Sequence, residues 1–498
     1  MTDRRVAIVV AVLTSGVGAV ATSFALFTTG EAFLGAPVHR FALESLPGWL
    51  VSSVVRTVGE YALGVSVVAS GAALSVVVGS AAVAGSWLGA RALPSVDRWA
   101  GVAGSTGFVL CVAAPLVGAV NGVVPAIVGG IVATYVGVVA EVPDARAGEA
   151  DVDSARRSLV NAVAGVSGFA VVAVGVGLDR RRQPQRAERE LPDRDVRREA
   201  EAVLEEVGTA ELDVEGGKPL VTDVGDFFTV DINVGTPSID PADWRLAITG
   251  LVEEEREFGY DDVRDREVVH QFKTIRCLSD NLDDDLLDTA LWTGCRVEPL
   301  LEAAEPQGEY ALLTGADDYF YSMPVARLEG CLLAYGMNGL ELPARHGYPV
   351  RLLVPDRWGK LHVKWLTEIE IVDAEAGGYW EERGWHGMGP VNAVTKIDRL
   401  DRTGDRVRLV GHAYAGARGV DAVEVSTDGG GTWAEATLSE PLPDPDTARQ
   451  WTYAFDPAAV RNGEVSARTI DGEGTVQPEA RSEPFPDGAT GWARRSLE

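Results

Sequence analysis

A single cysteine, Cys277, stands at the end of an apolar run that is typical of a β-strand, Val268 to Ile275. The chain then turns polar at Asp280 and Asn281 and becomes apolar again toward Trp292. A thiolate placed at a strand end can serve as a soft ligand to a metal ion. Most lone cysteines are buried structural thiols, so the surrounding motifs must decide between the two interpretations.

The other cysteines narrow the chemistry. Cys111, Cys277, Cys295 and Cys331 include no CxxC pair, which excludes a zinc ribbon or a ferredoxin-type cluster. They also provide no disulfide framework. The chain has no CxxCH motif for covalent haem, so we expect electrons to pass to or from a separate protein or a quinone.

Acidic residues are concentrated in the C-terminal part of the chain. Residues 1–189 carry 12 acidic and 14 basic side chains, and the remainder carries 61 and 30, a net charge of −31. Nucleic-acid binding is excluded, because phosphates require a basic surface. The chain has only five lysines, which favours a protein from a high-salt environment over an ordinary acidic protein.

The N-terminal region, residues 1–180, is predicted to be a transmembrane domain. Five segments approach the length of about 20 apolar residues that a spanning helix needs. These are Val6–Thr28, Tyr61–Leu88, Trp99–Val120, Val123–Ala140 and Leu159–Gly177. They contain no histidine for haem and almost no charge for an ion path, so we interpret them as an anchor or a docking site for an electron-accepting partner.

Arginine placement predicts that the C-terminal part lies outside the cytoplasm. Arginines fall on one side of the membrane if the N-terminus is inside, and five spans then leave the rest of the chain outside. The sequence Ser154-Ala-Arg156-Arg157-Ser-Leu159 resembles a twin-arginine export signal. Ordinary positive-inside arginines are the alternative, and Arg180-Arg181-Arg182 after the fifth span opposes export.

Three further regions follow the membrane part. Residues 181–225 are charged and are predicted to be a linker, with one short helical pattern at 196–207. Residues 226–382 mix β-type runs, such as Phe227–Asn233 and Trp244–Gly250, with a short helix at Pro299–Ala304, which predicts an α+β domain. Residues 383–498 show short alternating strands separated by Gly, Asp and Pro turns, a pattern that predicts an immunoglobulin-like β-sandwich.

From about residue 215 onward the chain resembles the sulfite oxidase superfamily of molybdopterin-dependent oxidoreductases. The most specific signal is a series of motifs in fixed order rather than the cysteine alone. The motifs are Thr274-Ile-Arg-Cys277, Trp292-Thr-Gly294, Asp317-Asp-Tyr319, Met337-Asn-Gly339, Leu342-Pro343, His346-Gly-Tyr-Pro-Val-Arg351, His362-Val-Lys364-Trp365 and Gly411-His-Ala413. The resemblance implies a sulfite-oxidase-type molybdopterin domain followed by a β-sandwich that often mediates dimerisation.

The resemblance also assigns roles by position. It makes Cys277 the molybdenum ligand and gives catalytic roles to Tyr319 and Arg418. It assigns contacts to molybdopterin, whose phosphate needs cationic donors. The residues implied are Phe228, Thr229, Val230, Asp231, Ile232, Asp317, His346, Arg351, His362, Val363 and Lys364. Cys295 and Cys331 remain structural thiols.

The substrate pocket departs from the family pattern at two positions. Thr229 or Val230 and Leu282 stand where sulfite-oxidising members carry arginines. We expect two-electron oxygen-atom transfer like that of sulfite oxidase. Reduction of methionine sulfoxide or another S- or N-oxide is the alternative, because a less charged substrate suits the lost arginines. A membrane-anchored surface protein without enzymatic activity is the alternative of another class.

Overall fold

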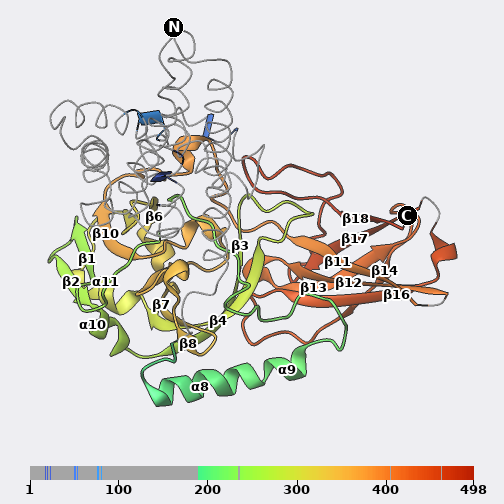
Figure 1. The fold of residues 1–498 in the computed structure, drawn as a ribbon, viewed down its shortest axis with the longest axis horizontal. Helices are drawn as coiled ribbons and strands as arrows, with labels where there is room; N and C mark the ends of the chain where they lie inside the picture. The colour runs from blue at the N-terminus through green and yellow to red at the C-terminus, as the bar shows by residue number, and fades with distance from the viewer. Residues whose placement is uncertain are drawn as a thin grey trace, which may run out of the picture. The chain divides into compact units, whose positions relative to one another are not determined.

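The computed structural model describes residues 189–233, 236–403, 405–460 and 463–497, with eleven isolated positions before residue 81 (Figure 1). Apart from those positions, the five predicted spans lie outside the described residues. Among the residues that are described, no helix combines the length and apolarity needed to cross a membrane. The chain divides into two compact units, and the unit analysed below consists mainly of Gln185–Val230 and Ile239–Glu498.

The first sheet of the α+β domain is antiparallel and carries Cys277 at the end of one strand. Its order is β3-β4-β7-β8, with β9 paired to β7. The strands are β3 (Val269–Arg276), β4 (Leu287–Arg296), β7 (Leu332–Met337), β8 (Leu340–Glu341) and β9 (Arg351–Leu353). Nearly every residue of β4 is buried, so both faces of this strand are covered and its apolar run is continuous.

The second sheet is mixed and has the order β2-β1-β10-β5-β6. Only β1 and β10 run parallel. Its strands are β1 (Arg245–Gly250), β2 (Arg256–Gly259), β5 (Tyr310–Gly315), β6 (Phe320–Pro324) and β10 (Leu366–Val372). Helices α10 (Tyr260–Arg264) and α11 (Glu298–Ala304) accompany the sheets, and α11 has its proline in the first turn, as predicted.

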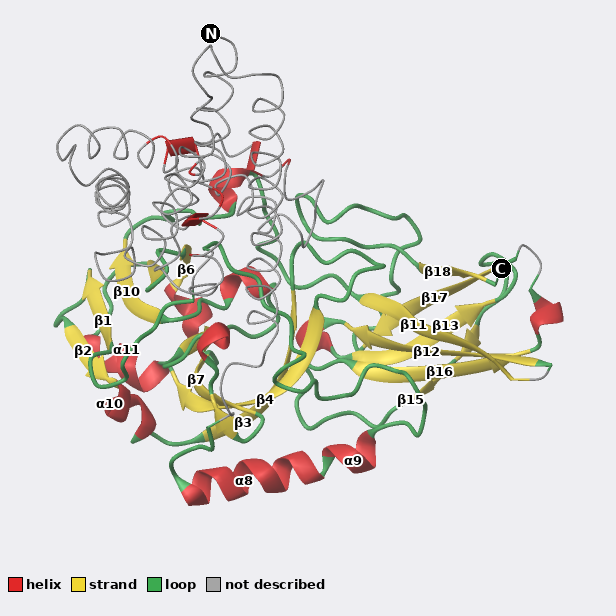
Figure 2. Ribbon diagram, in the orientation of Figure 1, coloured by secondary structure: helices red, strands yellow, loops and turns green. Residues whose placement is uncertain are grey.

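Two four-stranded antiparallel sheets form the C-terminal domain (Figure 2). Their orders are β11-β12-β16-β15 and β14-β13-β17-β18. The strands are β11 (Val394–Thr403), β12 (Arg406–Tyr414), β13 (Val420–Ser426), β14 (Ala434–Glu435), β15 (Thr437–Leu438), β16 (Arg449–Phe455), β17 (Glu464–Asp471) and β18 (Ala493–Ser496). Both sheets contribute to one core that includes Leu409, Val423, Trp451 and Val465. Two packed sheets agree with the predicted sandwich, and its immunoglobulin-like character stays a prediction.

The segment predicted as a charged linker is folded over its described residues, 189–225. It contains α8 (Arg194–Glu205) and α9 (Val207–Ala210), and the carboxylate of Asp193 caps α8. Ala200 and Leu220 join a buried cluster that also includes Leu291 of β4 and Leu442 of the C-terminal domain. The segment therefore contacts both domains (Figure 1).

One predicted strand is absent. The run Phe227–Asn233 forms no strand in the described structure. Instead, the backbone N–H of Phe228 donates to the buried carboxylate of Asp288 at 2.7 Å. A side-chain acceptor from β4 thus replaces the strand partner that the apolar pattern predicted, because a backbone donor near the core must be satisfied by some group.

Candidate molybdopterin site

The loop that follows β3 is shaped around Cys277. The N–H of Cys277 donates to the carbonyl oxygen of Leu286 at 2.9 Å, and the N–H of Asp280 donates to the carbonyl oxygen of Cys277 at 3.1 Å. The thiol is half-buried, and its Sγ lies 3.1 Å from the hydroxyl of Ser279. Burial is the largest cause that raises the thiol pKa, so without a cation or metal ion the thiol form is favoured.

Two other loops approach the Cys277 loop closely, each at a glycine. A Cβ atom at Gly359 would lie 3.2 Å from the carbonyl oxygen of Arg276 and 3.5 Å from the Cα of Cys277. A Cβ atom at Gly387 would lie 2.5 Å from a methyl carbon of Leu278, and Gly387 has a positive φ of 55°. These loops therefore form the immediate surroundings of the cysteine.

Tyr319 lies near Cys277, as the resemblance implied. Its buried hydroxyl donates to the carbonyl oxygen of Lys360 at 2.6 Å. Burial raises the phenol pKa well above 10, with smaller contributions from nearby acidic groups that include Glu381 and the Cys277 thiol. Tyr319 therefore remains protonated at neutral pH and can act only as a neutral hydrogen-bonding group.

The sequence did not identify a buried ion pair beside Tyr319. The ammonium group of Lys360 bonds to the carboxylate of Glu381 and to the carbonyl oxygen of His386. It also lies 5.5 Å from the ring centroid of Tyr321. Lys360 is one of only five lysines and stands four residues before Lys364, and this is the signal that could have drawn attention to it.

Arg418, the third predicted catalytic residue, is held by carboxylates. It ends the short helix η7 (Gly416–Arg418), and its Nε donates to Asp471 at 2.9 Å. A second nitrogen donates to the carbonyl oxygen of Val391 at 2.7 Å, and a third lies 3.5 Å from the carboxylate of Asp356. In the described structure, all of these contacts of Arg418 are with Asp471, Asp356 and the carbonyl oxygen of Val391. None of them is with Cys277 or Tyr319.

The predicted phosphate-binding residues do come together. His346 ends the helix η4 (Ala344–His346) and is buried. Burial, which has the largest effect, and the nearby cations Arg351, Lys364 and Arg345 together lower its pKa to about 3. His346 is therefore a neutral imidazole surrounded by three cationic side chains. Such a cluster suits a dianionic phosphate, which gains charge-assisted hydrogen bonds from each donor.

The backbone holds this cluster compactly. Arg351 donates to the carbonyl oxygens of His346 at 3.1 Å and His362 at 3.3 Å, and its guanidinium lies 5.1 Å from the ring centroid of Trp292. Gly347 has a φ of 114°, and a Cβ atom there would lie 2.9 Å from the Cβ of Arg351 and 3.1 Å from that of Lys364. Any larger residue at position 347 would push the two cations apart.

The segment at 228–230 contacts the same cluster. Lys364 donates to the carbonyl oxygen of Val230 at 3.1 Å, and Arg345 donates to the hydroxyl of Thr229 at 2.8 Å. Arg345 was missed in the sequence, although it directly precedes His346. Asp231 and Ile232 belong to the other compact unit, so the described contacts do not place them in this site.

His362 and Asp317 have structural contacts. The Nδ1 of His362 accepts the N–H of Val354 at 2.9 Å, and its Nε2 lies 3.2 Å from the carbonyl oxygen of Arg357. Both ring nitrogens are thus bonded to backbone, and burial lowers the pKa of His362 well below 6.5. Val363 is fully buried beside it. The carboxylate of Asp317 is buried and accepts the N–H of Tyr319 at 3.2 Å.

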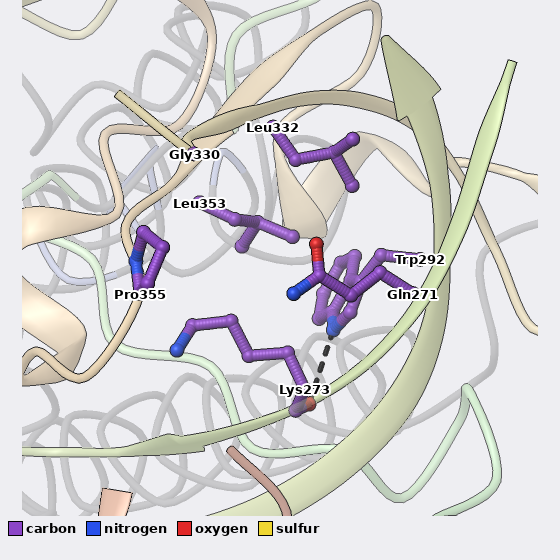
Figure 3. Close-up of a pocket in the computed structure, with 7 residues that line it drawn as sticks. All are labelled: Gln271, Lys273, Trp292, Gly330, Leu332, Leu353 and Pro355. Atoms are coloured by element: carbon purple, nitrogen blue, oxygen red, sulfur yellow. Dashed lines mark hydrogen bonds between the residues drawn. The ribbon is translucent and has the colours of Figure 1, made fainter. Parts of the chain in front are cut away.

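A small space behind this cluster is lined largely by core side chains (Figure 3). Its lining residues are Gln271, Lys273, Trp292, Gly330, Leu332, Leu353 and Pro355. The indole N–H of Trp292 donates to the carbonyl oxygen of Lys273 at 3.2 Å (Figure 3). Trp292 lines this space, and its ring also contacts the guanidinium of Arg351. Through its hydrogen bond to Lys273, Trp292 therefore connects β3, the strand before Cys277, to the cationic cluster.

Comparison with known proteins identifies the family. The family model described as "Oxidoreductase molybdopterin binding domain" matches residues 233–380, and the one described as "Mo-co oxidoreductase dimerisation domain" matches residues 391–484. Mitochondrial sulfite oxidase of Macaca fascicularis is 28% identical over 308 residues, which cover 51% of this chain and 56% of that protein. The NADPH nitrate reductase of Aspergillus niger is 25% identical over 258 residues, covering 40% of this chain and 30% of that protein.

Among solved structures, the sulfane dehydrogenase SoxCD from Paracoccus pantotrophus aligns with a TM-score of 0.49 and 22% identity, covering 56% of this chain and 83% of that one. The chain spans about half the length of the mammalian sulfite oxidases that it matches. The matched models describe a molybdopterin-binding oxidoreductase domain and a dimerisation domain, and the relatives are molybdenum enzymes, so molybdopterin is the cofactor that these matches support. The two matched domains and these relatives support a member of the sulfite oxidase superfamily of molybdopterin-dependent oxidoreductases.

Proposed function

We propose that this chain catalyses two-electron oxygen-atom transfer to or from a small sulfur or nitrogen compound. The bound cofactor would supply a molybdenum centre that exchanges an oxo group and two electrons. Cys277 would hold the metal as a thiolate, and Arg345, His346, Arg351 and Lys364 would hold the pterin phosphate. The mutual proximity of these four phosphate-binding candidates is the observation that carries the proposal.

A neutral oxo compound fits the site better than sulfite does. In the described structure, the cations near Cys277 and Tyr319 are bonded to carboxylates: Arg276 to Asp280 at 2.8 Å, and Lys360 to Glu381. Leu282, which replaces a family arginine, is buried and apolar. An anion with up to two charges would lose hydration here without gaining an uncompensated cation. Reduction of methionine sulfoxide or a similar S- or N-oxide therefore becomes the favoured direction, with sulfite oxidation second.

The residues of the chain would act on such a substrate through hydrogen bonds. Tyr319 keeps its proton at neutral pH, so any contact that it makes with a substrate oxygen involves a neutral phenol. Lys360 positions Tyr319 through its carbonyl oxygen and is itself neutralised by Glu381. In the reductive direction, the oxide substrate, two electrons and two protons give the reduced compound and water, and the electrons come from a separate protein or a quinone.

A substrate panel tests this assignment. With molybdenum-loaded enzyme and artificial electron carriers, we expect kcat/KM for methionine sulfoxide to exceed that for sulfite at least about tenfold, or ~1.4 kcal/mol in transition-state binding. Leu282→Arg should lower the ratio of the two kcat/KM values, because it adds a cation that favours sulfite. Leu251→Arg, at a position that is 41% exposed, should leave this ratio unchanged. Rapid sulfite turnover by the unmodified enzyme would show that paired cations do not exclude the anion.

We further propose that residues 1–180 anchor the enzyme in the membrane, with the catalytic domain on the outer side, and that the domain at 391–484 supports a homodimer. The apolar segments, the arginine distribution and the description of the matching dimerisation domain support these assignments. Added protease should cleave within residues 190–498 in intact cells. Complete protection, with cleavage only after the cells are lysed, would contradict the outer location.

A further inference from the structure

The loop that carries Cys277 is held largely by the C-terminal domain rather than by its own domain. Lys396 of β11 is buried and reaches across to this loop. Its ammonium group donates to the carboxylate of Asp280 at 2.5 Å and to the carbonyl oxygens of Asn281 at 2.9 Å and Asp284 at 2.6 Å. All three hydrogens of one ammonium group thus bond to a loop that lies more than 100 residues away in the sequence.

Asp280 connects this lysine to the residue that precedes the cysteine. Its other carboxylate oxygen accepts the Nε–H of Arg276 at 2.8 Å. The side chains of Arg276 and Asp280 are fully buried, and that of Lys396 is 4% exposed. The carboxylate also accepts the N–H of Leu286 at 3.1 Å, where the loop rejoins β4. A single buried carboxylate therefore joins both ends of the Cys277 loop to the neighbouring domain.

Arg276 makes the same connection through its remaining nitrogens. They donate to the carbonyl oxygen of Asn392 at 3.0 Å and to that of Ala489 at 3.2 Å, both in the C-terminal domain. Its guanidinium lies 5.0 Å from the ring centroid of Trp358. Arg481 adds an exposed contact, with hydrogen bonds to Asn281 at 3.1 Å and to Asp283 at 2.8 Å.

We infer that Lys396 is a positioning residue for the molybdenum ligand: through Asp280 and the loop carbonyls it sets the path of the backbone that presents the Cys277 thiolate. The inference rests on the proposed role of Cys277 as metal ligand. Under this inference, the C-terminal domain helps to fix the geometry of the metal site in the same chain. A side chain that contacts a metal ligand only through the backbone can still control ligand geometry, because the thiolate direction follows the loop conformation.

Charge balance explains why this arrangement uses two cations and one carboxylate. Asp280 alone would be a buried anion, and Arg276 compensates it. The second cation, Lys396, shares the same carboxylate, and its two remaining hydrogens are accepted by the carbonyl oxygens of Asn281 and Asp284 as the loop curls around the ammonium group. Removing Lys396 leaves the Arg276–Asp280 pair neutral but frees the carbonyls of Asn281 and Asp284 to turn toward water. The loop then loses the contacts that fix its curvature.

Lys396→Met in the full chain tests the inference. With protein from a host that supplies the cofactor, we expect molybdenum content to fall several-fold and the electron paramagnetic resonance spectrum of the partly reduced metal to shift. Lys396→Arg, which retains a cationic donor, should restore the content to within about twofold of the unmodified chain and return the spectrum toward its original form. Neither readout depends on turnover.

Lys273→Met is the matched control. Lys273 is also a buried lysine bonded to a carboxylate across the same interface, that of Asp446, but it makes no recorded contact with the Cys277 loop. We expect this variant to lose thermal stability while keeping the molybdenum content and the spectrum. Equal metal loss in both variants, or an unchanged spectrum and content in Lys396→Met, would overturn the inference.

Arg481→Ala provides a milder test if Lys396→Met does not fold. Arg481 is 45% exposed, so its removal should change the unfolding temperature little while shifting the metal spectrum in the same direction. An unaltered spectrum and molybdenum content in this variant would then overturn the inference. Absence of molybdenum from the unmodified chain is a different result, because it would contradict the proposed function itself.

Discussion

Replacing Cys277 with serine is expected to lower turnover at least about a thousandfold, because an alcohol is a poor substitute for a soft thiolate on molybdenum. The change should leave the loop folded. The backbone bonds of Cys277 to Leu286 and Asp280 do not involve the sulfur, whose one recorded polar contact is with Ser279 at 3.1 Å. The measurement is steady-state turnover with an artificial electron carrier, expressed per folded chain, together with the molybdenum content.

Cys295→Ser and Cys331→Ser are the matched controls. Both thiols are buried, and burial raises their pKa values to about 12, so neither is a thiolate at neutral pH. We expect these variants to lose stability without losing more than about half of the activity per molybdenum atom, since a buried hydroxyl disturbs packing but leaves the metal ligand in place. If Cys277→Ser kept its activity or Cys295→Ser abolished it, another residue would have to hold the metal.

Local patterns predicted those elements whose stability depends on their own sequence. The apolar run before Cys277 predicted β3, and the segment Pro299–Ala304 predicted α11, which the structure begins one residue earlier at Glu298. The run at Phe227–Asn233 has the same apolar character but forms no strand, because the carboxylate of Asp288 takes the N–H of Phe228. No local pattern reveals an acceptor that lies sixty residues away in the sequence.

The charged segment at 189–225 illustrates the same limit. Its many acidic and basic residues predict a solvated linker, yet Ala200 and Leu220 are buried between elements of both domains. The few apolar residues that pack are enough to fix the segment, because burying each one removes apolar surface from water. Which apolar residues find a partner depends on the tertiary arrangement and cannot be read from composition.

The candidate site divides in a similar way. His346, Arg351 and Lys364 were recognised because two short family motifs, at 346–351 and 362–365, contain them, and the structure brings them together. Lys360 and Lys396 were not recognised, since their meaning lies in partners that are 21 and 116 residues away. The sequence thus predicted the candidate phosphate-binding groups, whereas the buried ion pair of Lys360 and the contacts of Lys396 with the Cys277 loop emerged only from the structure.

Arg351→Met is expected to reduce the molybdenum and pterin content at least about tenfold, or ~1.4 kcal/mol of binding free energy. Arg351 is buried within the cationic cluster, where a phosphate would gain a charge-assisted hydrogen bond that water cannot match in strength. Methionine can retain the contact with Trp292 but has no charge and no donor. The measurement is metal analysis together with release and quantification of the pterin from the folded, purified chain.

Arg296→Met separates loss of the phosphate donor from loss of an ordinary, half-buried arginine. Arg296 ends β4 and also donates to backbone, with 2.8 Å to the carbonyl oxygen of Gly330, but it is not among the cations that act on His346. Both variants lose hydrogen bonds to carbonyl oxygens, each costing about 1 kcal/mol of folding stability. Only Arg351→Met should lose the cofactor. Equal cofactor content in the two variants would show that the cluster around His346 binds something other than the pterin phosphate.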